Sequence, residues 1–178
     1  WLKKKLKRTE LYGKTLCLVG IGNIATEVAK RAAAFGMKVV AYDKFVQESK
    51  WAEMQPSLKE AVKDADYISL HLPLTESTEK IINKDVIAAF NKKPVIINTG
   101  RGPTTDAQDI KEALEKGTVS FFATDVWPSD PPPSDDPILQ APNTLMTPHI
   151  GANSEENLLR IGDEAYGIIK EAVDGGKL

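Results

Sequence analysis

The sequence predicts an α/β fold, a doubly wound parallel sheet with helices on both faces. Short apolar runs rich in β-branched residues alternate with helix-like stretches along the chain, and this alternation is typical of parallel sheets. The runs are apolar nearly throughout, as in strands that are covered on both faces. A glycine turn, "VGIGNIA" (19–25), joins the first run to the first helix-like stretch, where such sheets bind ligands.

The apolar runs define the expected strands, and the segments between them define the helices. Strands are expected at 15–19, 38–42, 67–70, 95–98 and 119–126, with a weaker sixth at 144–147. Helices are expected at 23–35, 57–65, 84–90, 106–117 and 154–173. The last helix has Ser154 as its N-cap and acidic residues in its first turn, which favour helix initiation.

The composition fits one domain of a soluble protein. The chain has 178 residues and a formal net charge of −2, which indicates neither nucleic acid nor a membrane surface as a partner. We expect a dinucleotide-binding domain over 1–178 with a lead-in over 1–12, whose basic start, "WLKKKLKR", is interpreted as solvated. No apolar run approaches the roughly 18 residues of a membrane span, and no signal peptide is evident.

The chain has a single cysteine, Cys17. It excludes an internal disulfide and favours a reducing compartment, which predicts a cytoplasmic protein. Its apolar neighbours predict a small buried residue in a strand.

The glycine turn predicts a dinucleotide site. Gly20 permits a tight turn, Gly22 lets the backbone approach a pyrophosphate at the helix N-terminus, and Ala25 is small enough for close packing. Asp43 ends the second strand, where its carboxylate would accept hydrogen bonds from the adenosine ribose; the alternative is that it caps a surface loop. This carboxylate would repel a 2′-phosphate, so NAD is expected rather than NADP, although the neighbouring Lys44 weakens the preference.

Longer motifs extend this interpretation over nearly the whole chain. They are "ELYGKTLCLVGIGNIATEVAKRAAAFGMKVVAYD", "HLPLTESTEKIIN", "VIINTGRG", "ATDVW" followed by "PPP", and "TPHIGA". In this order they resemble the D-isomer-specific 2-hydroxyacid dehydrogenases, with the lead-in and "PHIGANSEEN" most similar to the D-3-phosphoglycerate dehydrogenase branch. The resemblance implies a Rossmann-type NAD-binding domain of an oxidoreductase that moves a hydride between a D-2-hydroxy acid and NAD, in serine biosynthesis for that branch.

The resemblance also implies three catalytic residues. His149 corresponds to the general acid/base of the "PH" motif, and an imidazole suits that task because it titrates near working pH. Arg101 in "NTGRG" would clamp the substrate carboxylate and polarise the keto oxygen. Asp130 replaces a glutamate that pairs with the histidine, so we expect this contact to be weaker or to need a loop shift, since the side chain is one methylene shorter.

A cofactor-binding set follows from the same resemblance. It comprises Gly20, Gly22, Asn23, Ile24, Asp43, Pro73, Thr78, Thr99, Asp125, His149 and Gly151. Asp125 matches the residue that receives the nicotinamide carboxamide. Asn23 and Gly100 depart from the arginine and alanine usual in the family, and Asn23 is expected to lower cofactor affinity. His71 is interpreted as structural or cofactor-lining, and no metal site is expected.

Several alternatives remain open at this point. Hydroxypyruvate or glyoxylate reduction and D-lactate oxidation compete with 3-phosphoglycerate oxidation, and an NAD-sensing, corepressor-like binding module is a candidate from another class. The expected partners are a small 2-hydroxy or 2-keto acid and a second copy of the chain. Because the chain starts at Trp1 rather than Met, we expect a piece of a two-domain protein that lacks its substrate domain and is poorly active alone.

Overall fold

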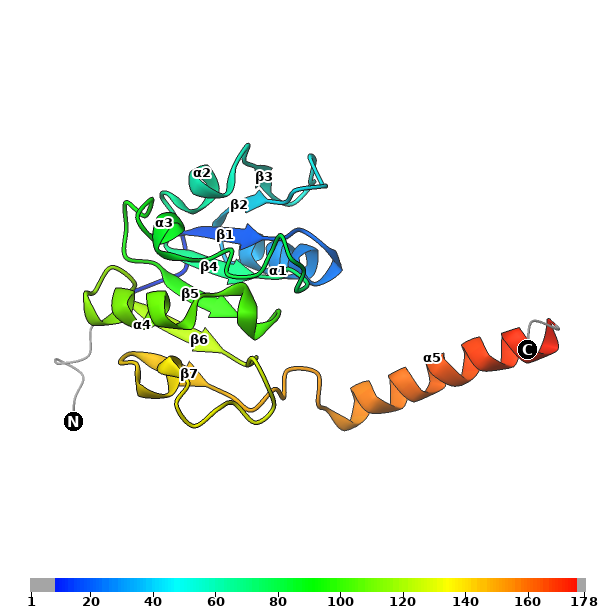
Figure 1. The fold of residues 1–178 in the computed structure, drawn as a ribbon. Coiled ribbons are helices and arrows are strands. Elements are labelled where there is room, and N and C mark those ends of the chain that lie inside the picture. Colours follow the sequence, from blue (N-terminus) through cyan, green and yellow to red (C-terminus); the bar gives the residue numbers. More distant parts are fainter. Residues whose placement is uncertain (1–8, 176–178) are drawn as a thin grey trace, which may run out of the picture.

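The computed structural model describes residues 9–175, and the basic segment "WLKKKLKR" lies outside them. A seven-stranded sheet with the order β3-β2-β1-β4-β5-β6-β7 forms the centre (Figure 1). All pairs of neighbouring strands are parallel. The predicted α/β class with a doubly wound parallel sheet is therefore confirmed.

The strands follow the apolar runs of the sequence closely. They are β1 Thr15–Val19, β2 Lys38–Tyr42, β3 Glu53–Met54, β4 Tyr67–Leu70, β5 Val95–Asn98, β6 Phe121–Thr124 and β7 Thr144–Met146. The run 119–126 forms a shorter strand than predicted. At one end the Val119 amide bonds to Ala113 O at the end of the preceding helix, and at the other the Thr124 hydroxyl engages the backbone of Val126.

The helices begin close to the predicted positions. They are α1 Asn23–Ala34, α2 Leu58–Val62, α3 Lys84–Ile87, α4 Ala107–Glu115 and α5 Glu155–Asp174, with 3-10 turns η1 Gly102–Thr104 and η2 Pro137–Gln140. The shorter helices end earlier than predicted because their last amides bond three residues back, as Ala65 N does to Val62 O and Phe90 N to Ile87 O.

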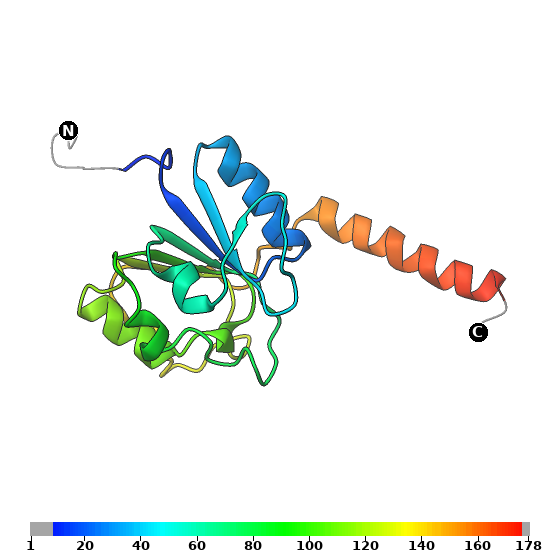
Figure 2. The same cartoon turned by 90° about the horizontal axis from the view of Figure 1, so that it is seen from above.

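Helices cover the two faces of the sheet unequally. Figure 2 shows α1 on one face and α2, α3 and α4 on the other. Along β1 the side chains alternate between two cores, with Leu16 and Leu18 in the cluster under α1 and Cys17 and Val19 in the larger cluster opposite. Cys17 is fully buried, as predicted, and burial raises the pKa of its thiol to about 12.

The strand order places the site. After β3 the chain crosses over to β4, so the connections that follow β1 and β4 lead to opposite sides of the molecule. Ligands of such sheets bind at the carboxyl ends of the strands beside this switch point. The loops after β1, β4, β5, β6 and β7 all open at that edge, and they carry the candidate residues.

The last helix, α5, extends away from the sheet (Figures 1 and 2). None of its residues is buried. The predicted N-cap is confirmed, because the Ser154 hydroxyl accepts a hydrogen bond from Asn157 N. Within residues 9–175, no helix combines the length and apolar character that crossing a bilayer requires.

Candidate cofactor and catalytic site

The glycine turn after β1 needs its first glycine. Gly20 has φ +91°, and an added Cβ would lie 2.9 Å from Leu72 Cδ2 and 3.0 Å from His71 O. Its amide donates to Tyr42 O at 2.8 Å. Ala25, at the third position of the motif, is fully buried between helix and strand. The sequence interpretation of both positions therefore agrees with the local structure.

The N-terminus of α1 has no side-chain cap. Its N-cap, Gly22, has no side chain to accept from the first-turn amides, and no acidic residue lies in that turn. An added Cβ at Gly22 would meet nothing within 4 Å, so the turn opens to free space. Free amides and the positive end of the helix dipole together favour a phosphate there.

A cavity of about 420 Å³ lies against this helix end. Its lining comes from the loops after β1, β4 and β5. The residues are Gly22, Asn23, Ile24, Ala25, His71, Leu72, Pro73, Thr99, Gly100 and Arg101. The fold thus brings five residues of the predicted cofactor set to one cavity, together with the predicted carboxylate clamp.

Asp43 uses its carboxylate within the protein. Oδ2 accepts from Ile21 N at 3.0 Å, and Oδ1 accepts from Phe45 N at 2.8 Å and Val46 N at 3.1 Å. Burial alone would raise the pKa of this carboxyl, but the three backbone hydrogen bonds outweigh it and lower the pKa. Asp43 therefore joins the glycine turn to the loop after β2. From the sequence, a structural role for this residue was expected only as the alternative, the cap of a surface loop.

The Thr78 side chain also forms its hydrogen bonds within its own loop. Its hydroxyl donates to Pro73 O at 2.6 Å and accepts from Thr75 N at 2.8 Å. Thr78 is not among the residues that line the cavity. Its contacts fix the segment from Pro73 to Thr78, which the sequence assigned to the cofactor site.

His71 lines the cavity from the end of β4. Its Nε2 lies 2.9 Å from the Ser69 hydroxyl, and burial lowers the pKa of the imidazole. A neutral ring is therefore the stable form at this place. The position agrees with the structural or cofactor-lining role predicted for it.

The loop that presents Arg101 is fixed by a buried amide. Asn98 is fully buried; its Nδ2 donates to Arg101 O at 3.0 Å and its Oδ1 accepts from Gly100 N at 3.1 Å. The Thr104 hydroxyl donates to the same Arg101 carbonyl at 2.6 Å. The Arg101 side chain is exposed, and its Nη1 donates to Gly100 O at 2.7 Å.

Gly100 explains one departure from the family pattern. An added Cβ there would lie 3.1 Å from Leu72 O and 3.3 Å from Leu70 O. The alanine usual at this position would therefore need the end of β4 to move by a few tenths of an ångström. In this chain, the glycine lets the two loops approach more closely.

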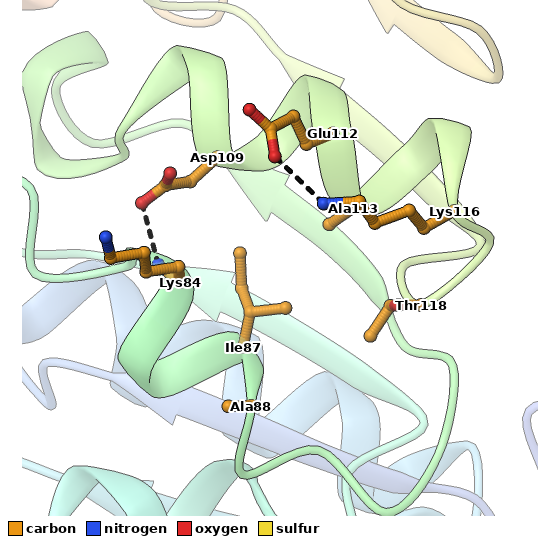
Figure 3. A pocket seen from close by; sticks show the side chains of 8 residues that line it. All are labelled: Lys84, Ile87, Ala88, Asp109, Glu112, Ala113, Lys116 and Thr118. Carbon is orange, nitrogen blue, oxygen red and sulfur yellow. Dashed lines mark hydrogen bonds and ion pairs between the residues drawn. The ribbon is translucent and has the colours of Figure 1, made fainter.

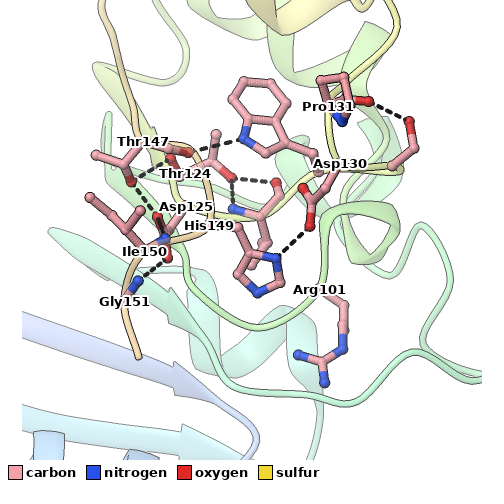
Figure 4. Close-up of polar contacts among 12 residues, drawn as sticks. Arg101, Thr124, Asp125, Asp130, Pro131, Thr147, His149, Ile150 and Gly151 are labelled. Atoms are coloured by element: carbon pink, nitrogen blue, oxygen red, sulfur yellow. Dashed lines mark hydrogen bonds and ion pairs between the residues drawn. The ribbon is translucent and has the colours of Figure 1, made fainter. Parts of the chain in front are cut away.

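His149 and Asp130 form a direct pair. His149 Nδ1 lies 2.7 Å from Asp130 Oδ2 (Figure 4). Of the two expected outcomes, a weaker contact or a compensating loop, the second agrees with the structure: the loop after β6 places the shorter carboxylate at full hydrogen-bonding distance. His149 has φ +57°, a left-handed conformation that is uncommon outside glycine. In the view of Figure 4 the Arg101 side chain extends below the imidazole.

Asp125 holds the turn that carries His149. Its Oδ1 accepts from the Thr147 hydroxyl at 2.6 Å and from Ile150 N at 2.9 Å, and its Oδ2 accepts from Gly151 N at 2.7 Å. Burial would raise the pKa of this carboxyl, but these hydrogen bonds, and His149 nearby, lower it. A Cβ at Gly151 would lie 2.9 Å from Asp125 Oδ2, so a larger residue would have to displace this carboxylate.

Three residues that position these groups were missed at the sequence level. They are Asn98, Trp127 and Thr147. The available signal was a polar or donor side chain at or just beyond the end of an apolar strand. A single sequence does not reveal the partners: Asn98 bonds the backbone of its own loop, Trp127 bonds the Thr147 carbonyl, and the Thr147 hydroxyl bonds the Asp125 carboxylate. Within residues 9–175, no group of three or more His, Cys, Asp or Glu side chains is arranged to hold a metal ion.

A second cavity, of about 280 Å³, lies between α3 and α4, away from these residues (Figure 3). Both of its carboxylates have partners within the groove. Lys116 Nζ lies 2.9 Å from Glu112 Oε2, and Lys84 N donates to Asp109 Oδ2 at 2.8 Å. The groove therefore joins two helices and adds nothing to the site.

The chain was compared with known proteins. Residues 1–151 match the family model described as D-isomer specific 2-hydroxyacid dehydrogenase, NAD binding domain. Hydroxypyruvate reductase of Thermotoga maritima is 45% identical over 166 residues, which is 92% of this chain and 54% of the relative. D-3-phosphoglycerate dehydrogenase of Methanocaldococcus jannaschii is 40% identical over 179 residues, 98% of this chain and 34% of the relative.

A solved structure agrees with these relatives. The D-lactate dehydrogenase of Aquifex aeolicus, complexed with NAD and lactic acid, superimposes with a TM-score of 0.87 and 31% identity, over 96% of this chain and 56% of that one. The chain thus spans about half, or less, of the length of the proteins it matches. It belongs to the family of D-isomer-specific 2-hydroxyacid dehydrogenases, to their NAD-binding domain.

Proposed function

We propose that this chain is the cofactor-binding and proton-transfer half of an NAD-dependent D-2-hydroxyacid dehydrogenase. The carrying observation is the 2.7 Å contact between His149 and Asp130, at the same sheet edge as a cavity that adjoins a free helix N-terminus. A base with its own carboxylate partner beside a dinucleotide cavity is what alcohol oxidation requires.

The residues present fit NAD. The uncapped turn of α1 would hold the pyrophosphate, and Ile24, Pro73 and Thr99 would line the rest of the cavity. Asp43 would receive a ribose hydroxyl on Oδ2, which accepts from one backbone amide and so has a second lone pair free, whereas Oδ1 already accepts from two. Its negative charge opposes the 2′-phosphate of NADP. When bound, NAD would supply the acceptor for the hydride that leaves the substrate carbon.

The chain's own groups would do the rest of the chemistry. In the neutral imidazole, Nδ1–H donates to Asp130, which leaves Nε2 free to take the proton of the substrate hydroxyl. The Asp130 carboxylate then stabilises the imidazolium that forms. Arg101 would bind the substrate carboxylate in a two-pronged contact that also fixes the reacting carbon.

Two substrate classes are favoured by the relatives. Proteins similar to this chain are named hydroxypyruvate reductase and D-3-phosphoglycerate dehydrogenase, so we propose a three-carbon D-2-hydroxy acid or its 2-keto acid. A phosphorylated substrate would place the protein in serine biosynthesis. Glyoxylate and D-lactate remain the alternatives within the same reaction class.

We further propose a cytoplasmic homodimer whose second domain closes the cleft. The chain spans 54% of the hydroxypyruvate reductase relative, which leaves room for another domain in the whole protein. Apolar side chains of α5, such as Leu159, Ile168 and Ile169, are exposed and would need a cover. The one cysteine is reduced and buried, as suits a reducing compartment.

A substrate panel tests the proposal. The full-length protein that contains this chain would be assayed with D-3-phosphoglycerate, D-glycerate and D-lactate plus NAD, and with hydroxypyruvate and glyoxylate plus NADH. We expect turnover with at least one three-carbon acid and a preference for NAD over NADP. Tight NAD binding without turnover of any of them would favour a sensing module and exclude the dehydrogenase.

A further inference from the structure

The three candidate catalytic side chains come from three separate loops. Arg101 follows β5, Asp130 follows β6 and His149 follows β7. All three are exposed, with 48% of the His149 side chain and 56% of the Asp130 side chain open to solvent. Their own packing therefore does little to set the distances among the loops, and some other contact must do so.

The backbone of Trp127 lies directly against the Arg101 loop. An added Cβ at Gly102 would lie 2.4 Å from Trp127 C, 2.6 Å from its O and 2.8 Å from its Cα. Such distances leave no room for any side chain, and the obstructing atoms are backbone, which does not move aside. The residue after Arg101 is thus packed on the residue three positions before Asp130.

The indole of Trp127 reaches the third loop. Its Nε1–H donates to Thr147 O at 3.0 Å, two residues before His149. The Thr147 hydroxyl bonds to Asp125, which in turn holds the amides of Ile150 and Gly151. One tryptophan therefore contacts the Arg101 loop through its backbone and the His149 turn through its ring.

Trp127 is itself fixed to the protein interior. Its half-buried ring packs against the larger core cluster. On the outer side it borders a cavity of about 420 Å³ together with Asp130, Pro131, Met146 and Pro148. The indole hydrogen bond therefore joins the loops after β6 and β7 on the side of this cavity, in addition to the hydrogen bonds that Asp125 makes between the same loops.

We propose that Trp127 is a positioning residue that keeps Arg101, Asp130 and His149 in register across three loops. The inference rests on the proposed dehydrogenase function. No other aromatic side chain would serve, because phenylalanine has no donor and the hydroxyl of tyrosine lies farther along the ring. Phenylalanine would remove only the indole hydrogen bond to the His149 turn, and that turn is not among the residues that line the cofactor cavity, so Trp127→Phe is expected to act on the reaction step.

The test uses Trp127→Phe in the full-length protein, with Trp51→Phe as the matched control. Trp51 lies in the loop between β2 and β3, near Lys30 and Lys50, at the end of the sheet opposite to β5, β6 and β7. We expect Trp127→Phe to lower kcat about 10- to 100-fold, the range for misplaced catalytic groups, with the NADH Kd unchanged within about twofold. Trp51→Phe should leave both values at the wild-type level.

A double-mutant comparison separates positioning from general damage. In a His149→Ala background the base is gone, so Trp127→Phe should lower the residual turnover less than about threefold. An equal loss in both backgrounds, or wild-type kcat in Trp127→Phe alone, would overturn the inference. If His149→Ala itself kept wild-type turnover, the proposed function would fail, a result distinguishable from failure of the Trp127 role.

A second variant covers the case in which Trp127→Phe does not fold. Gly102→Ala leaves the indole intact but forces the Arg101 loop away from the Trp127 backbone. We expect a similar loss of kcat, and here the NADH Kd should rise as well, because Thr99, Gly100 and Arg101 of this loop line the cofactor cavity. Wild-type kcat in Gly102→Ala would show that this contact does not set the register, and would overturn the inference.

Discussion

The contact between His149 and Asp130 shows how backbone placement compensates for a shorter side chain. The carboxylate reaches the imidazole at 2.7 Å although it has one methylene less than the glutamate usual in the family. Backbone placement also decides the contacts of Asp43 and Asp125, which accept from three and two backbone amides respectively. At the residue scale, the sequence predicted the pair of Asp130 and His149, whereas the backbone amides that Asp43 and Asp125 accept from could not be predicted, because every residue except proline carries one.

The first prediction concerns this pair. Asp130→Asn should lower kcat by about 10²–10³, because the amide no longer stabilises an imidazolium and its NH₂ group favours the wrong ring tautomer. Asp130→Glu, the residue usual in relatives, should retain activity within about tenfold. His149→Ala should cost about 10²–10⁴ in kcat. Steady-state kinetics of the full-length protein would measure all three, and equal activity of Asp130→Asn and wild type would remove the carboxylate from the mechanism.

A second prediction concerns His71 and pH. Burial lowers the pKa of this imidazole from its ordinary 6.5. The unfolded chain therefore binds a proton at His71 more strongly than the folded chain does. Stability is therefore complete above about pH 7 and falls as the pH drops through 6.5 toward the lower folded pKa. His71→Gln should flatten this fall, and urea unfolding at pH 7.5, 6.5 and 5.5 would measure it.

The other shifted groups do not interfere in this pH range. Among residues 9–175 they are carboxyls with a pKa lowered from 3.8 or 4.5, lysines with a pKa raised from 10.5, and Cys17. None of them gains or loses a proton near pH 6. A His71→Gln variant with the same slope as wild type between pH 7.5 and 5.5 would therefore contradict the assignment of a neutral, buried ring.

At the scale of elements, strand bounds were predicted correctly where a continuous apolar run marks the strand. Strands β1, β2, β4 and β5 begin and end where their apolar runs do, since burial on both faces decides them. Strand β3 was missed because its two residues, Glu53 and Met54, form an edge with no apolar run. Helix ends were misplaced by up to three residues at α2 and α3 because the choice between α and 3-10 bonding there depends on tertiary contacts.

The third prediction uses the N-terminus of α1. Gly22 lies in extended backbone, with φ −75° and ψ −165°, which any residue adopts. Asp at this N-cap should stabilise the helix by a few tenths of a kcal/mol relative to glycine, yet its charge should weaken NADH binding about tenfold or more. Gly22→Asn is the matched control, because it caps without a charge.

Calorimetric titration with NADH and thermal unfolding would be run on both variants. A larger loss of affinity in Gly22→Asp than in Gly22→Asn, at equal or higher stability, is the expected result. Equal affinities would mean that no phosphate lies over this helix end.

For the whole molecule, the candidate residues lie along one open edge of the sheet. The loops after β1, β4 and β5 form the cofactor cavity, and those after β6 and β7 supply the His149–Asp130 pair. The strand order of the sheet brings these loops together. The sequence predicted the class of sheet, a doubly wound parallel sheet, but not the order of its strands. The exposure of all of α5 was not predictable, since its apolar residues alone do not say what they pack against.

The last prediction follows from the openness of this edge. About half of the His149 and Asp130 side chains is exposed to solvent, and a hydride transfer needs water excluded and the substrate held from both sides. The chain covers 54% of the hydroxypyruvate reductase relative, so we expect the opposite wall to lie in the rest of the protein. This chain alone should therefore bind NADH within about tenfold of the full-length affinity, because the cavity is formed by its own loops. Its turnover should be lower by more than about 10³, the scale of lost positioning and desolvation. The test measures NADH formation by this chain and by the full-length protein at matched concentration. Comparable turnover numbers would show that the rest of the protein is not needed for the reaction at this edge of the sheet.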